Sequence, residues 1–245
     1  MRITLFKEQI QEIGQDNHGS EEDGQTDVAL PWYRINAIGW IAPLLQLVLF
    51  VLLALLVRKY PILNIDIRIT HTLQKNRSPL LRSIAKILTY CCGSPAILRT
   101  TAVGVALYLW AIRLRLEAIM TLGITFSSAL LKNGLQSLIN RPRPSPLLIE
   151  VYQKSKGKSF PSGHVITSLT SWGWFMALYI QLFKRKSRWQ RAVLSIPALF
   201  IGITGPTRIY LGDHWASDVL GGYLFGSAYL SFFVYWYKRL KRRDK

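Results

Sequence analysis

Apolar residues recur in six stretches along the chain, and most are long enough to cross a lipid bilayer as a helix. Such a helix needs about 20 mostly apolar residues. The stretches are 38–57, 95–112, 118–139, 162–183, 192–204 and 218–236. The fifth is short, and an extension through residue 210 is the alternative. The pattern predicts an all-α fold, a bundle of six transmembrane helices.

Residues 58–94, between the first two stretches, alternate between apolar and polar positions at helical spacing. The apolar positions are Ile67, Leu73, Leu80, Leu81, Ile84, Ile87 and Leu88. This pattern predicts an amphipathic helix that lies on the membrane surface.

The first 30 residues differ in composition from the rest of the chain. They hold seven acidic residues and only two basic ones, and Pro31 follows them. We therefore predict two parts: a polar acidic tail over residues 1–30, and a membrane domain over residues 31–245.

The net charge of +18 sits mainly in short basic clusters at the ends of the apolar stretches. This distribution favours a membrane protein over a nucleic-acid-binding one. Clusters at 113–115, 184–191 and 238–245 fall on one side of a six-span topology. The positive-inside rule makes that side cytoplasmic, together with both termini. The opposite, non-cytoplasmic side receives residues 58–94, 140–161 and 205–217. The last two are also basic, which suggests anion binding.

The first candidate cluster is Arg141, Pro142, Arg143 and Pro144, directly after the third stretch. The prolines end the helix and keep the chain extended. A guanidinium presents planar donors that match phosphate oxygens. Taken alone, the run is equally typical of a basic loop that touches lipid headgroups.

The second cluster, Pro161, Ser162, Gly163 and His164, opens the fourth stretch. Proline at a helix start leaves the following amides free to bind an anion. Ser162 adds a hydroxyl donor, Gly163 permits close approach, and His164 is placed to act as a general acid. An ordinary capped helix start is the alternative interpretation.

The third cluster contains Arg208, His214 and Asp218. The histidine and the aspartate are four residues apart, so they are neighbours on one helical face. A carboxylate bonded to one imidazole nitrogen leaves the other nitrogen free as a nucleophile. A surface pair without a catalytic role is the alternative. His18 and His71 have no comparable neighbours.

Together the three clusters resemble the motifs of the type 2 phosphatidic acid phosphatase (PAP2) and haloperoxidase superfamily, in its membrane lipid phosphatase branch. The resemblance extends from the first apolar stretch to the last. Two positions depart from the family pattern. Thr207 stands where a serine is usual, which is a small change, and Gln136 stands where a lysine is usual, seven residues before Arg143. The nearest lysine, Lys132, is one helical turn earlier, and its side chain leans away from the predicted outer site. Either residue is a candidate for the phosphate-binding role.

The resemblance implies phosphoryl transfer without a metal or another cofactor. His214 would attack phosphorus and Asp218 would orient it. His164 would protonate the leaving lipid oxygen and then activate water to release phosphate from a phosphohistidine. The implied function is a membrane phosphatase that hydrolyses the terminal phosphate of a phospholipid or polyprenyl (pyro)phosphate.

The same resemblance implies that Arg143, Arg208, Ser162 and the amide of Gly163 bind the phosphoryl oxygens. The implied partners are a lipid phosphate substrate and membrane lipids. Two alternatives share this fold: a lipid phosphotransferase and a catalytically weakened lipid-phosphate-binding protein. A transporter is disfavoured, because Lys132 is the only ionisable residue near the midplane of a predicted path.

Overall fold

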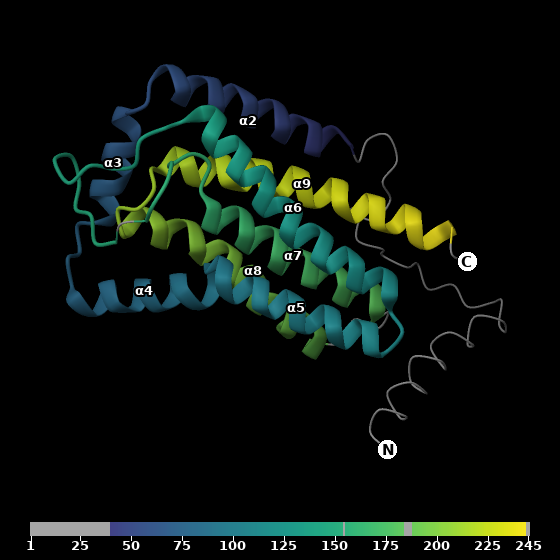
Figure 1. Cartoon of the computed structure of the whole chain (residues 1–245). Helices are drawn as coiled ribbons and strands as arrows, with labels where there is room; N and C mark the ends of the chain where they lie inside the picture. The colour runs from purple at the N-terminus through teal and green to yellow at the C-terminus, as the bar shows by residue number, and fades with distance from the viewer. Residues whose placement is uncertain (1–39, 154, 184–187, 244–245) are drawn as a thin grey trace.

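The computed structural model describes residues 40–153, 155–183 and 188–243, and every regular element among them is a helix (Figure 1). The helices are α2 (Ile41–Lys59), α3 (Asn64–Leu73), α4 (Pro79–Gly93), α5 (Pro95–Ala111), α6 (Arg115–Ile139), α7 (Gly163–Leu182), α8 (Arg188–Tyr210) and α9 (Ala216–Arg243). The all-α prediction is confirmed. The predicted acidic tail, residues 1–30, lies outside the described residues.

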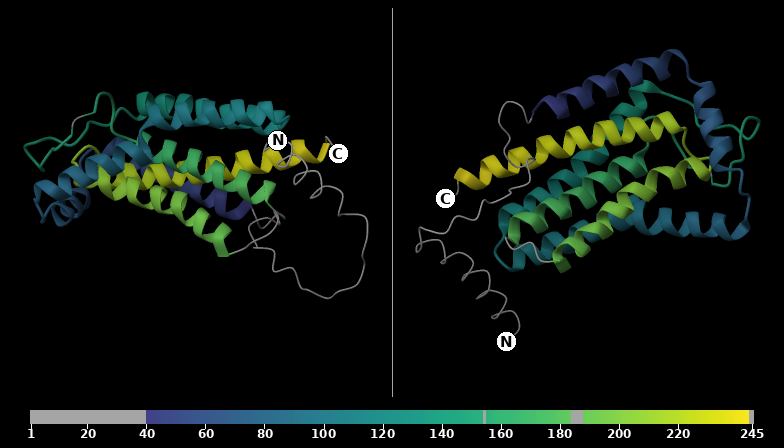
Figure 2. Two further views of the ribbon diagram at one scale, coloured as in Figure 1. Left: turned by 90° about the horizontal axis from the view of Figure 1, so that it is seen from below. Right: turned by 180° about the vertical axis from the view of Figure 1, so that it is seen from behind.

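The long helices α2 and α5 to α9 run alongside one another, and turned views keep this arrangement (Figures 1 and 2). Helix α7 lies at the centre, in contact with α4, α5, α6, α8 and α9. Helix α2 packs against α9 at the edge of the bundle. In the first turn of α7, Gly163, Val165 and Ile166 are buried, and His164 is partly buried.

The interior between α6, α7 and α9 is filled largely by aromatic rings. The fully buried Trp174 of α7 meets Phe233 and Tyr237 of α9 edge-on, with ring centroids 5.6 and 5.3 Å apart. Its indole N–H donates to the Thr121 hydroxyl of α6 over 2.9 Å. Edge-to-face rings and a satisfied indole donor fix the relative rotation of the three helices.

The outer surface of α2 is suited to hydrocarbon. Its 19 residues are about 28 Å long at 1.5 Å per residue, close to the thickness of a bilayer core. More than half of the surface of Leu44, Val48, Leu52 and Leu55 is exposed. A soluble protein rarely exposes so continuous an apolar face.

Four described segments are long and apolar enough to cross a membrane. They are Ile41–Lys59, Pro79–Ala111, Arg191–Tyr210 and Ala216–Arg242. Helices α6 and α7 are not among them, because they carry polar residues that the bundle buries. Glu117 of α6, for example, accepts hydrogen bonds from Tyr237 and Lys241 of α9 over 2.8 and 2.6 Å. The count of six spans stays a prediction.

The prediction of one amphipathic helix over residues 58–94 is wrong, because this segment forms two helices, α3 and α4. The chain turns between them, where the Asn76 side chain accepts a hydrogen bond from the Ser78 amide. Pro79 then starts α4, since proline is favoured at the first helical position. The predicted end of the fifth stretch at residue 204 is also wrong, and the alternative end at residue 210 is confirmed. Helix α8 continues to Tyr210 through Pro197 and Pro206.

Helix α3, residues 140–153 and 155–162, and the α8–α9 turn lie together at one end of the bundle (Figure 1). The C-terminal end of α9 and the turn between α5 and α6 lie at the other end. The three candidate clusters, far apart in the sequence, thus share one end of the molecule.

Candidate active site

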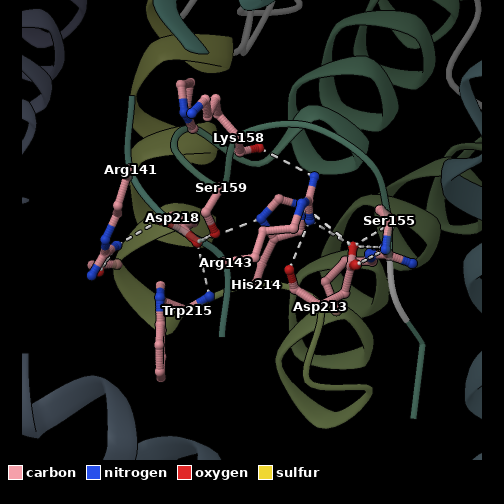
Figure 3. Close-up of polar contacts among 12 residues, drawn as sticks. Arg141, Arg143, Ser155, Lys158, Ser159, Asp213, His214, Trp215 and Asp218 are labelled. Carbon is pink, nitrogen blue, oxygen red and sulfur yellow. Dashed lines mark hydrogen bonds and ion pairs between the residues drawn. The ribbon is translucent and has the colours of Figure 1, made fainter. Parts of the chain in front are cut away.

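Hydrogen bonds join the backbone of the three clusters. The Ser159 amide donates to the Arg141 carbonyl, and the Ser162 amide donates to the Asp218 carbonyl, each over 3.0 Å. The segment that leads into α7 is thereby tied to the end of α6 and to the start of α9. These contacts bring the three clusters together. Figure 3 shows how Arg141 and Arg143 of the first cluster lie beside His214 and Asp218 of the third.

His214 lies in the turn between α8 and α9, and its ring is almost fully buried. Gly212 makes the turn possible: its φ is +68°, and a Cβ there would lie 2.2 Å from the Glu150 carbonyl oxygen. The His214 Nδ1 atom is 3.5 Å from Asp218 Oδ2. On the other side of the ring, Nε2 is 3.3 Å from Arg143 Nη1.

These neighbours assign the proton of the imidazole. Carboxylate oxygens lie 3.5 Å from both ring nitrogens, Asp218 Oδ2 from Nδ1 and Asp213 Oδ2 from Nε2. Because the Arg143 guanidinium beside Nε2 can only donate a hydrogen bond, it favours the lone pair on Nε2 and the N–H on Nδ1. Burial lowers the pKa of His214 below its ordinary value, because the charged ring loses solvation. The free ring is therefore neutral at neutral pH, which is the state that can attack phosphorus.

The carboxylate of Asp218 is held in place by donors other than His214. Its Oδ2 accepts hydrogen bonds from the Trp215 amide over 2.8 Å and from the Ser159 hydroxyl. Its Oδ1 accepts from Arg141 Nη1 over 2.6 Å. A carboxylate with several donors stays ionised and oriented, so it can stabilise a positive charge on His214.

Arg141 links Asp218 to helix α3. The guanidinium is fully buried, and its Nη2 donates to Asp66 Oδ2 over 2.7 Å. Asp66 also accepts from the amide and hydroxyl of Ser217, over 2.8 and 2.7 Å. Breaking such a buried pair typically costs about 3–5 kcal/mol. The sequence analysis includes Arg141 in the first candidate cluster but misses Asp66, although Asp66 is the only acid within residues 58–94.

His164 lies in the first turn of α7, opposite His214. One ring nitrogen of each histidine and a carboxylate oxygen of Asp213 all lie within 4.8 Å of one another. A phosphoryl group between the two rings would contact both imidazoles. The structure thus brings together the two histidines that the sequence singled out.

Arg143 is held in place by backbone carbonyls. Its Nη1 donates to the Asp213 carbonyl over 2.8 Å, Nε to Gly157 over 3.1 Å, and Nη2 to Lys158 over 3.2 Å. These bonds leave the guanidinium beside His214 Nε2. A positioned cation at this point can stabilise charge on a phosphoryl oxygen.

Arg208, in the last turn of α8, is fully buried. Its Nη2 contacts the carboxylate of Asp213, whereas Nε and Nη1 have no hydrogen-bond partner among the described residues. The buried hydroxyl of Ser162 likewise has none there. Buried donors are nearly always satisfied in proteins, so these three atoms indicate a site that binds an anion.

Lys132 and Gln136 occupy different positions. Lys132 lies against the start of α7: a Cβ on Gly163 would be 2.8 Å from Lys132 Cδ and 3.7 Å from its Nζ. Gln136 donates instead to the Pro161 carbonyl over 3.0 Å. The lysine side chain therefore lies beside the second cluster, at Gly163. The glutamine instead holds the backbone at Pro161, just before α7 begins. Gly163 leaves the space that the lysine side chain occupies.

The described residues offer one cluster with metal-ligand spacing, namely His164, Asp213 and His214. Burial alone would raise the pKa of Asp213, but His214, Arg208 and Arg143 outweigh it and hold this pKa at about 2. The carboxylate is thus ionised and already paired with two guanidiniums. Two fixed cations repel a third, so the cluster fits an anion better than a metal.

Comparison with known families identifies the chain. The model of the PAP2 superfamily matches residues 117–242, which include all three clusters. The chain belongs to the PAP2 superfamily.

Two phosphatases are similar to this chain. Phosphatidylglycerophosphatase B of Bacillus subtilis is 25% identical over 189 residues, which cover 75% of this chain and 89% of the relative. Lipid A 4'-phosphatase of Bacteroides thetaiotaomicron is 30% identical over 136 residues, which cover 51% and 56%.

A solved structure shares the fold. The crystal structure of a transmembrane PAP2-type phosphatidylglycerolphosphate phosphatase from Bacillus subtilis aligns with a TM-score of 0.71 at 23% identity. The alignment covers 83% of this chain and 98% of the other. Together with the apolar helices, these matches indicate that this PAP2 protein is a multi-pass membrane protein.

Proposed function

We propose that this PAP2 protein is a membrane phosphatase that removes the terminal phosphate of a lipid phosphate through a phosphohistidine. The observation that carries the proposal is the convergence of two imidazoles with buried, unpartnered donors of Arg208 and Ser162. Catalysis of phosphoryl transfer depends mainly on hydrogen-bond donors that are already positioned before the substrate binds. The phosphatase relatives support the same activity.

The chemistry proceeds in two steps at one phosphorus atom. Nε2 of His214 attacks, the bond to the lipid oxygen breaks, and His164 gives that oxygen a proton. Asp218 holds the Nδ1 proton and stabilises the charged ring. His164 then takes a proton from water, which attacks the phosphohistidine and releases inorganic phosphate.

The phosphoryl oxygens would bind to Arg143, Arg208, the Ser162 hydroxyl and the Gly163 amide. The amide belongs to the start of α7, where backbone N–H groups and the helix dipole favour an anion. This chain needs neither a metal nor another cofactor for these steps, because the cations are supplied by side chains. Guanidiniums suit this role, since they remain charged when buried.

The active site would face the non-cytoplasmic side of the membrane, with both termini in the cytoplasm. The site lies at the end of the bundle opposite the C-terminal end of α9. That helix ends in Lys238, Arg239, Lys241, Arg242 and Arg243. A cluster of this kind is retained on the cytoplasmic side. The substrate would enter from the outer leaflet.

Lys132, and not Gln136, is expected to supply the cation that the family motif carries one turn later. Replacing Lys132 with Met keeps its length and removes its charge, so kcat/KM should fall about 10²-fold, as for loss of a transition-state donor. Gln136→Lys should not raise the rate. Initial-rate measurements on both variants decide between the residues. Near-normal activity of Lys132→Met, with a faster Gln136→Lys enzyme, would reverse the assignment.

A panel of lipid phosphates tests the function itself. Purified protein is given phosphatidic acid, phosphatidylglycerol phosphate and a polyprenyl pyrophosphate, and free phosphate is measured in the presence and absence of EDTA. We expect phosphate release from at least one of them, unchanged by the chelator.

The products of the same reactions separate the alternatives. A new phospholipid without free phosphate would identify a phosphotransferase. Binding of lipid phosphate with no turnover of any substrate would identify a weakened binding protein.

A further inference from the structure

The carboxylate of Asp213 lies inside the site, yet none of the catalytic steps above uses it (Figure 3). Its side chain is fully buried. Asp213 Oδ2 is 3.1 Å from Arg143 Nη1, contacts Arg208 Nη2, and lies 3.5 Å from His214 Nε2. One carboxylate oxygen thus meets both phosphate-binding arginines and the nucleophilic nitrogen.

These three contacts are those that a phosphoryl group would make. Reacting atoms in a productive complex are about 3–3.5 Å apart. An oxygen 3.5 Å from His214 Nε2 therefore stands within the volume that the phosphoryl group must enter. Two further donors of the same arginine, Arg208 Nε and Nη1, have no hydrogen-bond partner among the described residues and are available to an anion.

We propose that Asp213 is an internal competitor of phosphate and sets the affinity of the site for phosphate anions. Its carboxylate occupies the anion site of the free enzyme, and the phosphoryl group of the substrate displaces Oδ2 from the two arginines. The inference rests on the proposed function for the identity of the competing anion.

The anchoring of the carboxylate permits this exchange. Ser155 holds it from the side away from His214: its amide donates to Asp213 Oδ1 over 2.8 Å, and its hydroxyl donates to Oδ2 over 2.9 Å. The side chain can keep the bond to the Ser155 amide while Oδ2 moves. No covalent bond changes in this step.

Competition of this kind has two consequences. Without substrate, the carboxylate offsets part of the positive charge of two neighbouring guanidiniums, one of which, Arg208, is fully buried and would be costly to leave without a counter-charge. After hydrolysis, its return favours release of inorganic phosphate. Asp213 therefore weakens the binding of substrate and product and shortens the lifetime of the product complex.

A purely structural role for Asp213 predicts the opposite result. If the carboxylate only aligned Arg143 and Arg208, removing its charge would leave the arginines misplaced and weaken phosphate binding. The sign of the change in affinity therefore distinguishes competition from alignment.

The test compares wild type with Asp213→Asn, as purified full-length protein, by calorimetric titration with inorganic phosphate and with orthovanadate. Removing a like charge next to the anion should tighten binding of both probes at least about tenfold. The matched control is Glu150→Gln, an exposed acid of the neighbouring loop that pairs with Arg77 over 3.3 Å. The control should change either affinity less than about twofold, as expected for an exposed pair.

Unchanged or weaker binding by Asp213→Asn overturns the proposal. If that variant does not fold, a structure of the wild-type protein with bound vanadate gives the answer. Asp213 Oδ2 should then have left His214 Nε2 and the arginines, and its persistence at 3.5 Å from Nε2 overturns the proposal. Calorimetry needs no turnover, so a protein that hydrolyses no lipid phosphate yet shows the tighter binding would refute the proposed function alone.

Discussion

Replacing His214 with alanine is expected to abolish the hydrolysis of every lipid phosphate that the wild-type protein accepts. The change removes the atom that forms the new bond to phosphorus, and neighbouring groups cannot replace it. Loss of a catalytic nucleophile typically lowers kcat by about 10⁴-fold or more. Binding of the lipid should change far less, because the arginines and the start of α7 remain. Phosphate release under saturating substrate measures the effect.

A matched control is available at the same end of the bundle. His71 is an exposed histidine in the last turn of α3. His71→Ala should therefore retain wild-type kcat and KM. Equal activities of the His214→Ala and His71→Ala enzymes would show that His214 is not the nucleophile.

Replacing His164 with alanine is expected to affect the two chemical steps differently. A lipid alkoxide leaves only with a proton, so turnover of lipid phosphate should fall about 10²–10⁴-fold, the usual contribution of a general acid or base. A nitrophenolate leaves without a proton, whereas hydrolysis of the phosphohistidine still needs His164 as a base. With p-nitrophenyl phosphate, the variant should release one nitrophenolate per site rapidly and then nearly stop.

Rapid-mixing absorbance measurements detect this burst. The wild-type enzyme should show steady turnover with the same substrate. If His164→Ala showed no burst and lost phosphoryl transfer and phosphohistidine hydrolysis equally, His164 would not act as an acid or base. It would then serve only to bind the substrate or to hold the structure of the site.

Much of the fold follows from the spacing of apolar residues. Each of the six predicted stretches overlaps one of α2 and α5 to α9, although α8 and α9 extend beyond the predicted limits, over residues 188–210 and 216–243. Residues 58–94 were predicted less well. Their apolar spacing fits one helix, whereas Pro79 and the Asn76–Ser78 contact divide it.

The main site residues also follow from the sequence, because the chemistry is concentrated in short motifs. The spacing of His214 and Asp218, and the helix start at His164, determine the local geometry of each motif. The choice between Lys132 and Gln136 was not predictable. The two lie one turn apart on the same face of α6, and only the axial position of α7 brings Lys132 to Gly163.

The ion pair between Asp66 and Arg141 could not be predicted from the sequence. The residues are 75 positions apart, and a buried ion pair between distant segments leaves no periodic signal. The direction of the Asp213 side chain depends on the turn at Gly212, so the sequence suggested neither its burial nor its contact with both arginines.

Transfer of the phosphoryl group to His214 is tested most directly by locating that group on the protein. The His164→Ala protein is mixed with p-nitrophenyl phosphate, quenched in alkali to preserve phosphohistidine, digested and analysed by mass spectrometry. We predict a single added phosphoryl group on His214, which is absent when His214 is also replaced by alanine. Phosphate bound covalently to any other residue, or a burst of nitrophenolate that persists in the double variant, would contradict the mechanism.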